Sequence, residues 1–128
     1  MASDRTRTPA QDAGAAAEEL VVVALLEAGW QIVGRNVHVG RAELDIVAID
    51  PGPPRELVVV EVRWRRRRDF GLAEETVDHR KRTRLRQAAH RLMERGDHPR
   101  LPLRLDLVAV EPAPDGRSAT IRHHRAVR

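Results

Sequence analysis

The sequence predicts an α/β (α+β) domain in which a mixed β-sheet is flanked by helices, in the order α-β-β-β-α-β-β. Two long segments of helical character each end at a glycine, and five short strand-like segments surround them. A proline-rich turn separates two of these strands. The 128 residues suit one domain with one modest core. We therefore expect a disordered tail over residues 1–11 and a single domain over residues 12–128.

The first helix is expected over residues 13–28, between a capping Asp12 and the terminating Gly29. It is apolar around nearly its whole circumference, so we expect it to be largely buried. Three strands follow, and the loop PGPP makes a hairpin between the last two. The strands are expected over residues 30–37, 43–49 and 57–62.

The second helix is expected over residues 74–95 and ends before Gly96. Its inward stripe should comprise Lys81, Leu85, Ala88, Ala89 and Leu92. Two more strands are expected over residues 103–110 and 118–124. Because hairpins pair strands in antiparallel fashion and a helical crossover permits a parallel pair, the sheet should be mixed.

Arginine dominates the basic residues: of 23 lysines and arginines, only Lys81 is a lysine. Codon usage in a GC-rich genome can explain that excess, but it does not explain why residues 1–62 carry a net charge of −5 and residues 63–104 a net charge of +8. This polarity favours nucleic acid, either DNA or RNA, as a partner, although a solvated helix face is the alternative. The expected contacts are Arg65, Arg66, Arg67, Arg68, Lys81 and Arg82.

Several classes of protein are excluded or disfavoured. The absence of cysteine rules out a disulfide scaffold, a zinc finger and a cysteine nucleophile. No apolar run approaches the about 18–20 residues of a membrane span, and the N-terminal residues lack the apolar core of a signal peptide. A glycine-rich phosphate loop is also missing. We therefore expect a cytoplasmic protein that does not bind membranes.

Two carboxylates stand out because each lies between apolar residues of a predicted strand, at Asp45 and Glu61. If these strands pair around the PGPP hairpin, the two side chains can converge on one point. Paired carboxylates suit Mg²⁺ or Mn²⁺, and such a cation can orient a phosphate and activate a water. The alternative is an inert salt bridge in which Arg63 neutralises either acid.

Five motifs in order carry a resemblance to a known family: AEELVVVALLEAGWQIVGRN, AELDIVAID, LVVVEVR, FGLAEETVDHRKRTRLRQAA and RLDLVAV. They resemble the YraN family of small bacterial proteins over about residues 14 to 111. That family is similar to the restriction-endonuclease-like, or PD-(D/E)XK, nuclease superfamily. The resemblance implies an endonuclease-like core.

The resemblance further implies that Asp45 and Glu61 are metal ligands and that Glu18 is a third acid near the site. Arg63 stands where the family motif Glu-x-Lys has its lysine. Arginine can supply charge and hydrogen bonds at a phosphate, but it does not release its proton near neutral pH. The implied catalytic set is therefore Asp45, Glu61, Arg63 and Glu18, with one member altered.

Three functions remain open from the sequence. The first is a Mg²⁺- or Mn²⁺-dependent endonuclease that hydrolyses phosphodiesters. The second is a non-catalytic nucleic-acid-binding module on the same fold, in which the lysine of Glu-x-Lys has been lost. The third is a protein-interaction domain whose arginines reflect codon usage alone.

Overall fold

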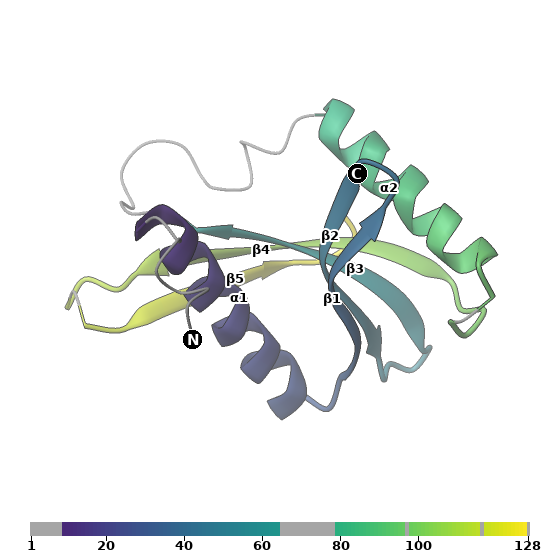
Figure 1. The fold of residues 1–128 in the computed structure, drawn as a ribbon. Coiled ribbons are helices and arrows are strands. Elements are labelled where there is room, and N and C mark those ends of the chain that lie inside the picture. Colours follow the sequence, from purple (N-terminus) through teal and green to yellow (C-terminus); the bar gives the residue numbers. More distant parts are fainter. Residues whose placement is uncertain (1–8, 65–78, 97, 116, 128) are drawn as a thin grey trace, which may run out of the picture.

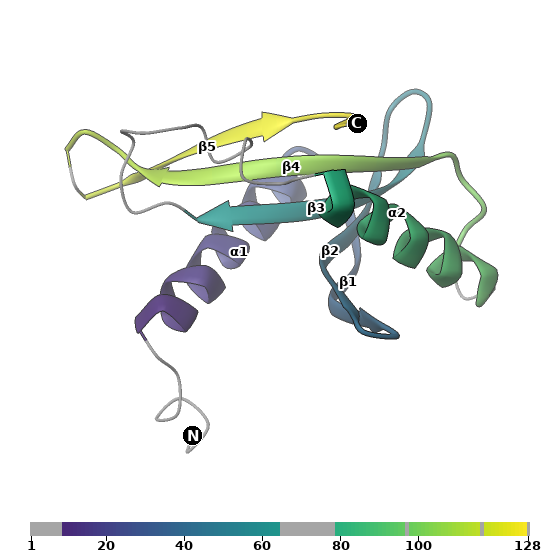
Figure 2. The same ribbon diagram turned by 90° about the horizontal axis from the view of Figure 1, so that it is seen from above.

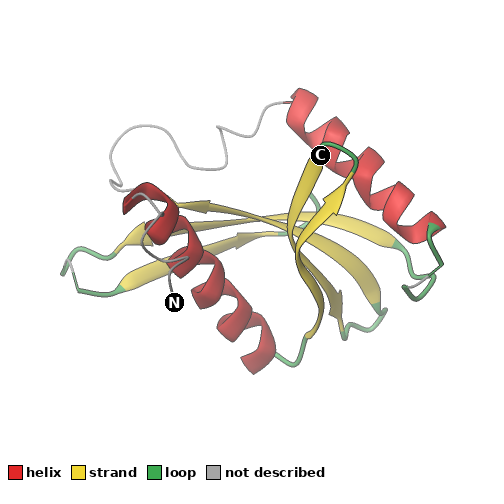
Figure 3. Ribbon diagram, viewed as in Figure 1, coloured by secondary structure: helices red, strands yellow, loops and turns green. Residues whose placement is uncertain are grey.

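The computed structural model of the protein describes residues 9–64, 79–96, 98–115 and 117–127. These ranges contain two helices and five strands in the predicted order, and Figures 1 and 3 show their arrangement. The elements are α1 (Pro9–Glu27), β1 (Gln31–Val39), β2 (Ala42–Asp50), β3 (Glu56–Trp64), α2 (His79–Glu94), β4 (Leu103–Pro112) and β5 (Ala119–His124). The predicted fold class and its mixed sheet are confirmed.

The five strands form one sheet in the order β1-β2-β3-β4-β5. β2 and β3 pair in antiparallel fashion around the PGPP loop, with Ile46 opposite Val60. β3 and β4 pair in parallel, with Val60 opposite Asp106, and the connection between them contains α2. The remaining neighbours are antiparallel. Each pairing therefore has the direction that its connection predicts.

The two helices cover opposite faces of the sheet (Figures 1 and 2). Along β3, Val58 and Val60 pack in the cluster that contains α1, whereas Leu57 and Val59 pack in the cluster that contains α2. This alternation follows from the two-residue period of a strand. Because both faces of β3 are covered, its central residues are apolar, and a charged residue there needs a specific partner.

The first helix differs from its prediction in two respects. α1 begins at Pro9, four residues before the expected start, because proline suits the first turn of a helix, where its missing N–H removes no bond. The expectation that this helix is largely buried is wrong. Leu20, Val23 and Leu26 are 44%, 43% and 52% exposed, since α1 packs on the sheet with one side only. No helix in the described ranges has the length and apolarity needed to cross a membrane.

The second helix agrees with its prediction over the described part. α2 ends at Glu94, and Gly96 follows with a φ of 79°, the left-handed conformation that terminates helices. Four of the five residues of the predicted inward stripe, Leu85, Ala88, Ala89 and Leu92, are buried. Residues 65–78, which include the predicted basic loop and the expected start of this helix, lie outside the described residues.

Candidate active site

Asp45 and Glu61 are brought together at the hairpin of β2 and β3. Each lies one residue beyond the paired Ile46 and Val60, so their side chains meet across neighbouring strands. The main-chain N–H of Val62 donates a hydrogen bond of 2.9 Å to Oδ2 of Asp45, and the two carboxyl groups share a hydrogen bond. The predicted convergence is confirmed. Lys81 of α2 also contacts Glu61. We call Asp45, Glu61 and Lys81 the acidic site.

The carboxyl group of Asp45 has an unusually high pKa. Burial, followed by the neighbouring charge of Glu61, raises the pKa of Asp45 to about 7, although the hydrogen bond from Val62 lowers it. Glu61 itself is only 5% exposed. When two carboxyl groups lie this close, the repulsion between their negative charges makes the doubly ionised state unfavourable. The site therefore favours either a shared proton or an added positive charge.

Lys81 supplies one positive charge at this place. Its Nζ lies 2.7 Å from Oε1 of Glu61, reached from the first turn of α2. The sequence interpretation assigned Lys81 to nucleic-acid contacts and to the inward stripe of its helix. It did not place Lys81 beside Glu61, because the two residues are 20 positions apart across a crossover. The signal that marks Lys81 is compositional, since it is the only lysine among 23 basic residues.

Arg63, which occupies the lysine position of the Glu-x-Lys motif, interacts with Glu61 more weakly. Its Nε lies 4.0 Å from Oε1 of Glu61, at the limit of an ion pair. The same Nε is buried and has no hydrogen-bond acceptor within the described ranges. A buried donor without an acceptor is costly in a folded protein, and a ligand is one explanation for its retention. The salt bridge considered between Arg63 and Glu61 is therefore present at this long distance, and Lys81 makes a closer contact with the same oxygen.

Glu18 lies at the edge of the acidic site. Burial raises the pKa of the half-buried Glu18, and the charges of Glu43 and Glu61 raise it further, while Arg35 lowers it. Glu18 thus lies within electrostatic range of Glu43 and Glu61. However, no group of three or more acids or histidines arranged to hold a metal occurs among the described residues. The part of Glu18 as a third ligand stays a prediction.

The acidic site nevertheless fits a divalent cation of the Mg²⁺ type. Such ions bind proteins through one or two carboxylates and complete their shell with waters and substrate phosphates. Lys81 contacts one oxygen of Glu61, and Val62 contacts one oxygen of Asp45, so each carboxylate has a second oxygen. A cation bound by Asp45 and Glu61 would take the place of the shared proton and would likewise reduce the repulsion between the two carboxylates. The observation that supports this fit is the meeting of the two carboxylates, together with the raised pKa of Asp45.

The basic residues predicted to bind nucleic acid are described only in part. Arg65 to Arg68 lie outside the described residues. Arg82 is half-buried one position after Lys81 in α2. This helix carries six basic residues and one acid, Glu94, within the described ranges. Trp64, which precedes the arginine run 65–68, is half-buried and packs against the α1 cluster.

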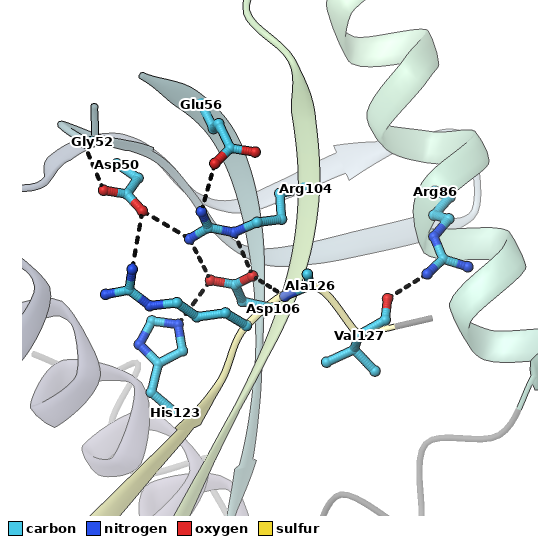
Figure 4. Close-up of polar contacts among 10 residues, drawn as sticks. Asp50, Gly52, Glu56, Arg86, Arg104, Asp106, His123, Ala126 and Val127 are labelled. Carbon is cyan, nitrogen blue, oxygen red and sulfur yellow. Dashed lines mark hydrogen bonds and ion pairs between the residues drawn. The ribbon is translucent and has the colours of Figure 1, made fainter. Parts of the chain in front are cut away.

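A second cluster of charged residues surrounds Arg104, as Figure 4 shows. Its guanidinium donates to Asp106 through Nε and Nη2, to Glu56 at 2.9 Å and to Asp50 at 2.9 Å. His123 and the main-chain N–H of Ala126 also contact the carboxylate of Asp106. Asp106 thus pairs with Arg104 and is not part of the acidic site. We call these residues the Arg104 cluster.

Fold and site together define a class: a small α+β domain whose mixed sheet holds two strand carboxylates against a helix lysine. Residues 17–110 match the model of the uncharacterised protein family UPF0102. The chain therefore belongs to UPF0102, and the resemblance to the YraN family is confirmed.

Relatives in several bacteria cover most of the chain. The UPF0102 protein of Symbiobacterium thermophilum is 39% identical over 104 residues, which are 81% of this chain and 86% of the relative. A UPF0102 protein of Porphyromonas gingivalis is 40% identical over 112 residues, covering 88% and 80%. That of Pseudomonas paraeruginosa is 39% identical over 113 residues, covering 88% and 87%. The residues that match the family model, 17–110, include β1, β2, β3, α2, most of β4 and the acidic site.

Proposed function

We propose that the protein hydrolyses phosphodiester bonds in nucleic acid with a divalent cation, Mg²⁺ or Mn²⁺, held by Asp45 and Glu61. One observation carries the proposal: the half-buried carboxylate of Asp45 and the buried carboxylate of Glu61 meet from adjacent strands, with an ammonium group 2.7 Å from Glu61. A purely structural pair of this kind destabilises the fold, because burial and like charge both raise the pKa of Asp45. Functional sites are where such arrangements are found most often.

Each residue of the acidic site has a different role in the proposed reaction. When bound, the cation supplies Lewis-acid polarisation of the phosphate and lowers the pKa of a water. Asp45 and Glu61 hold it, and the main-chain N–H of Val62 fixes the orientation of the Asp45 carboxylate. Lys81 holds Glu61 and adds positive charge where negative charge develops on the phosphoryl oxygens.

Arg63 has a separate task in this proposal. Its buried Nε–H lacks an acceptor among the described residues, and a phosphate oxygen can accept that hydrogen bond. Because Lys81 provides an ammonium group at Glu61, the replacement of lysine by arginine in Glu-x-Lys does not remove the ammonium from the site. The presence of arginine at position 63 is therefore compatible with catalysis.

The test is cleavage of labelled single-stranded, duplex and branched DNA and RNA in Mg²⁺ or Mn²⁺. We expect Asp45→Asn, Glu61→Gln and Lys81→Met each to reduce the rate at least about 100-fold. Asp12→Asn, an exposed acid at the start of α1, is the matched control and should cleave as the wild type does. If the wild type cuts none of these substrates in either metal, the proposal of an enzyme is wrong.

A second candidate is a nucleic-acid-binding module without catalysis. The observation that favours it is the Lys81–Glu61 ion pair, which neutralises Glu61 without any metal. This candidate predicts binding that weakens steeply with salt and does not depend on a divalent cation. It also predicts that Asp45→Asn binds as tightly as the wild type. Arg63→Lys separates the candidates further, because a module that lost catalysis with this lysine can cleave only after the lysine is restored, whereas the proposed enzyme cleaves before the change.

A further inference from the structure

A groove of about 370 Å³ lies directly beside the acidic site, between the β1–β2 hairpin and α2. Glu43 and Lys81 line the end next to the acidic site. The apolar part of the lining comes from both elements and consists of Val39, Ala42, Leu85 and Ala88. The volume is in the range of about 300–1,000 Å³ that is usual for pockets that bind small molecules.

Three arginines line the same groove: Arg41 from the hairpin, and Arg84 and Arg91 from α2. All three are exposed, and none forms an ion pair with a carboxylate in the described part of the chain. Arg104 and Arg122 differ, because carboxylates neutralise both of them. The groove therefore combines an apolar floor with a positively charged rim.

Contacts between the hairpin and the helix hold the groove in shape. The turn residue Gly40 has a φ of 60°, and a Cβ added there would lie 3.6 Å from Nη1 of Arg91. Arg95 donates a hydrogen bond of 3.3 Å to the carbonyl of His38. Val39 and Leu92, both buried, belong to the same apolar cluster. The two walls of the groove are thus joined before any ligand binds, which lowers the entropy lost on binding.

We propose that this groove binds one unpaired nucleotide of the nucleic-acid strand, with its base on the apolar floor and its flanking phosphates on Arg41, Arg84 and Arg91. The inference rests on the proposed function, because the strand in the groove is the one on which the acidic site acts. It names the substrate class as single-stranded nucleic acid, or a duplex with an unpaired segment. A base inside a duplex is stacked on both sides and cannot reach the floor.

The first experiment measures binding without metal, so that it does not depend on catalysis. Fluorescence anisotropy compares a labelled single-stranded oligonucleotide with its blunt duplex. The groove variant carries Arg41→Ala, Arg84→Ala and Arg91→Ala. The control variant carries Arg55→Ala, Arg100→Ala and Arg117→Ala, three exposed arginines outside the groove, and has the same net charge.

We expect the wild type to bind the single strand at least about tenfold more tightly than the duplex. The groove variant should lose this preference, and the slope of log K against log salt should fall by about 2, as expected for three lost phosphate contacts. The control variant should keep the preference. Equal losses in the two triple variants would overturn the inference, because net charge alone would then explain binding.

A second measurement changes the ligand and leaves the protein intact. A single abasic position is moved along the oligonucleotide, and the wild type is titrated with each version. A base on the apolar floor predicts that one position weakens binding about tenfold and that the others have little effect. Uniform affinity at all positions would overturn the assignment of a base to the groove.

Failure of the groove and failure of the proposed function give different results. Cleavage that requires Asp45, together with equal binding of single strand and duplex, would refute the groove and leave the function intact. Single-strand preference that requires the three arginines, without cleavage of any substrate, would refute hydrolysis and support the groove. Absence of binding to either form at low salt would overturn both.

Discussion

The Arg104 cluster and the acidic site both place carboxylates inside the sheet, yet they have opposite electrostatic characters. In the Arg104 cluster, hydrogen bonds from His123, Arg104 and Ala126 overcome burial and lower the pKa of Asp106 to about 2. In the acidic site, burial and Glu61 raise the pKa of Asp45 to about 7. The first arrangement stabilises the fold with its acids ionised. The second loses stability when Asp45 ionises, which is typical of a functional site that binds a ligand.

The largest expected effect concerns the Arg104 cluster. Arg104→Ala removes the shared partner of three carboxylates, one of them the fully buried Asp106. We expect the free energy of unfolding to fall by about 3–5 kcal/mol, the range for breaking a buried ion pair. Urea denaturation near neutral pH measures it. Arg55→Ala, at an exposed hairpin arginine, should change it by less than about 0.5 kcal/mol.

A loss below about 1 kcal/mol for Arg104→Ala would contradict the comparison. It would mean that the carboxylates of the cluster do not depend on their common arginine.

The second effect has the opposite sign. The folded state holds a proton on Asp45 up to about pH 7, whereas the unfolded chain releases it near 3.8, so wild-type stability is lost as pH rises between these values. Asp45→Asn removes the ionisation. We expect this variant to be about 2 kcal/mol more stable than the wild type near pH 8 and equally stable near pH 4. Urea denaturation at both pH values tests the expectation.

Asp106 provides the matched comparison for that experiment. Its lowered pKa means that stability is present above about pH 4 and lost as the pH falls toward 2. Asp106→Asn should therefore destabilise the protein near pH 8, where Asp45→Asn stabilises it. Destabilisation by both variants near pH 8 would show that the two clusters are alike.

The smallest expected effect is stabilisation by metal. Mg²⁺ at tenfold excess over its Kd should add about 1.4 kcal/mol and raise the Tm by a few degrees, because the folded state alone presents the paired carboxylates. Thermal unfolding with Mg²⁺, against Na⁺ at matched ionic strength, measures the shift. Asp45→Asn should abolish it, and Asp106→Asn should keep it. An equal shift in Asp45→Asn would place the metal elsewhere.

Local pattern was enough to predict the elements and the meeting of Asp45 with Glu61. Both carboxylates lie on strands joined by one hairpin, so pairing around PGPP fixes their register. The apolar pattern of α1 did not predict its exposed side. That outcome depends on how many elements pack around the helix, and the helix sequence does not contain this information.

Contacts between distant segments were beyond the sequence analysis. Arg104 reaches Asp50 and Glu56, which precede it by 54 and 48 residues, and Lys81 reaches Glu61 across the crossover. Such contacts depend on the parallel pairing of β3 with β4 and on the packing of α2 over the sheet. No periodicity in the chain encodes either distance. Only the isolated lysine in an arginine-rich sequence drew attention to one of these residues.

Because Lys81 contacts Glu61, a chemical label attached to the Lys81 amine would lie at the acidic site. Lys81 carries the only ε-amine in the 128 residues. Reductive methylation with a ¹³C-labelled reagent would therefore place a single side-chain NMR signal at the acidic site and leave every arginine unmodified. The methyl resonance would report directly on its neighbour, Glu61, as metal or nucleic acid is added. An arginine-rich composition thus gives this small domain a built-in spectroscopic label.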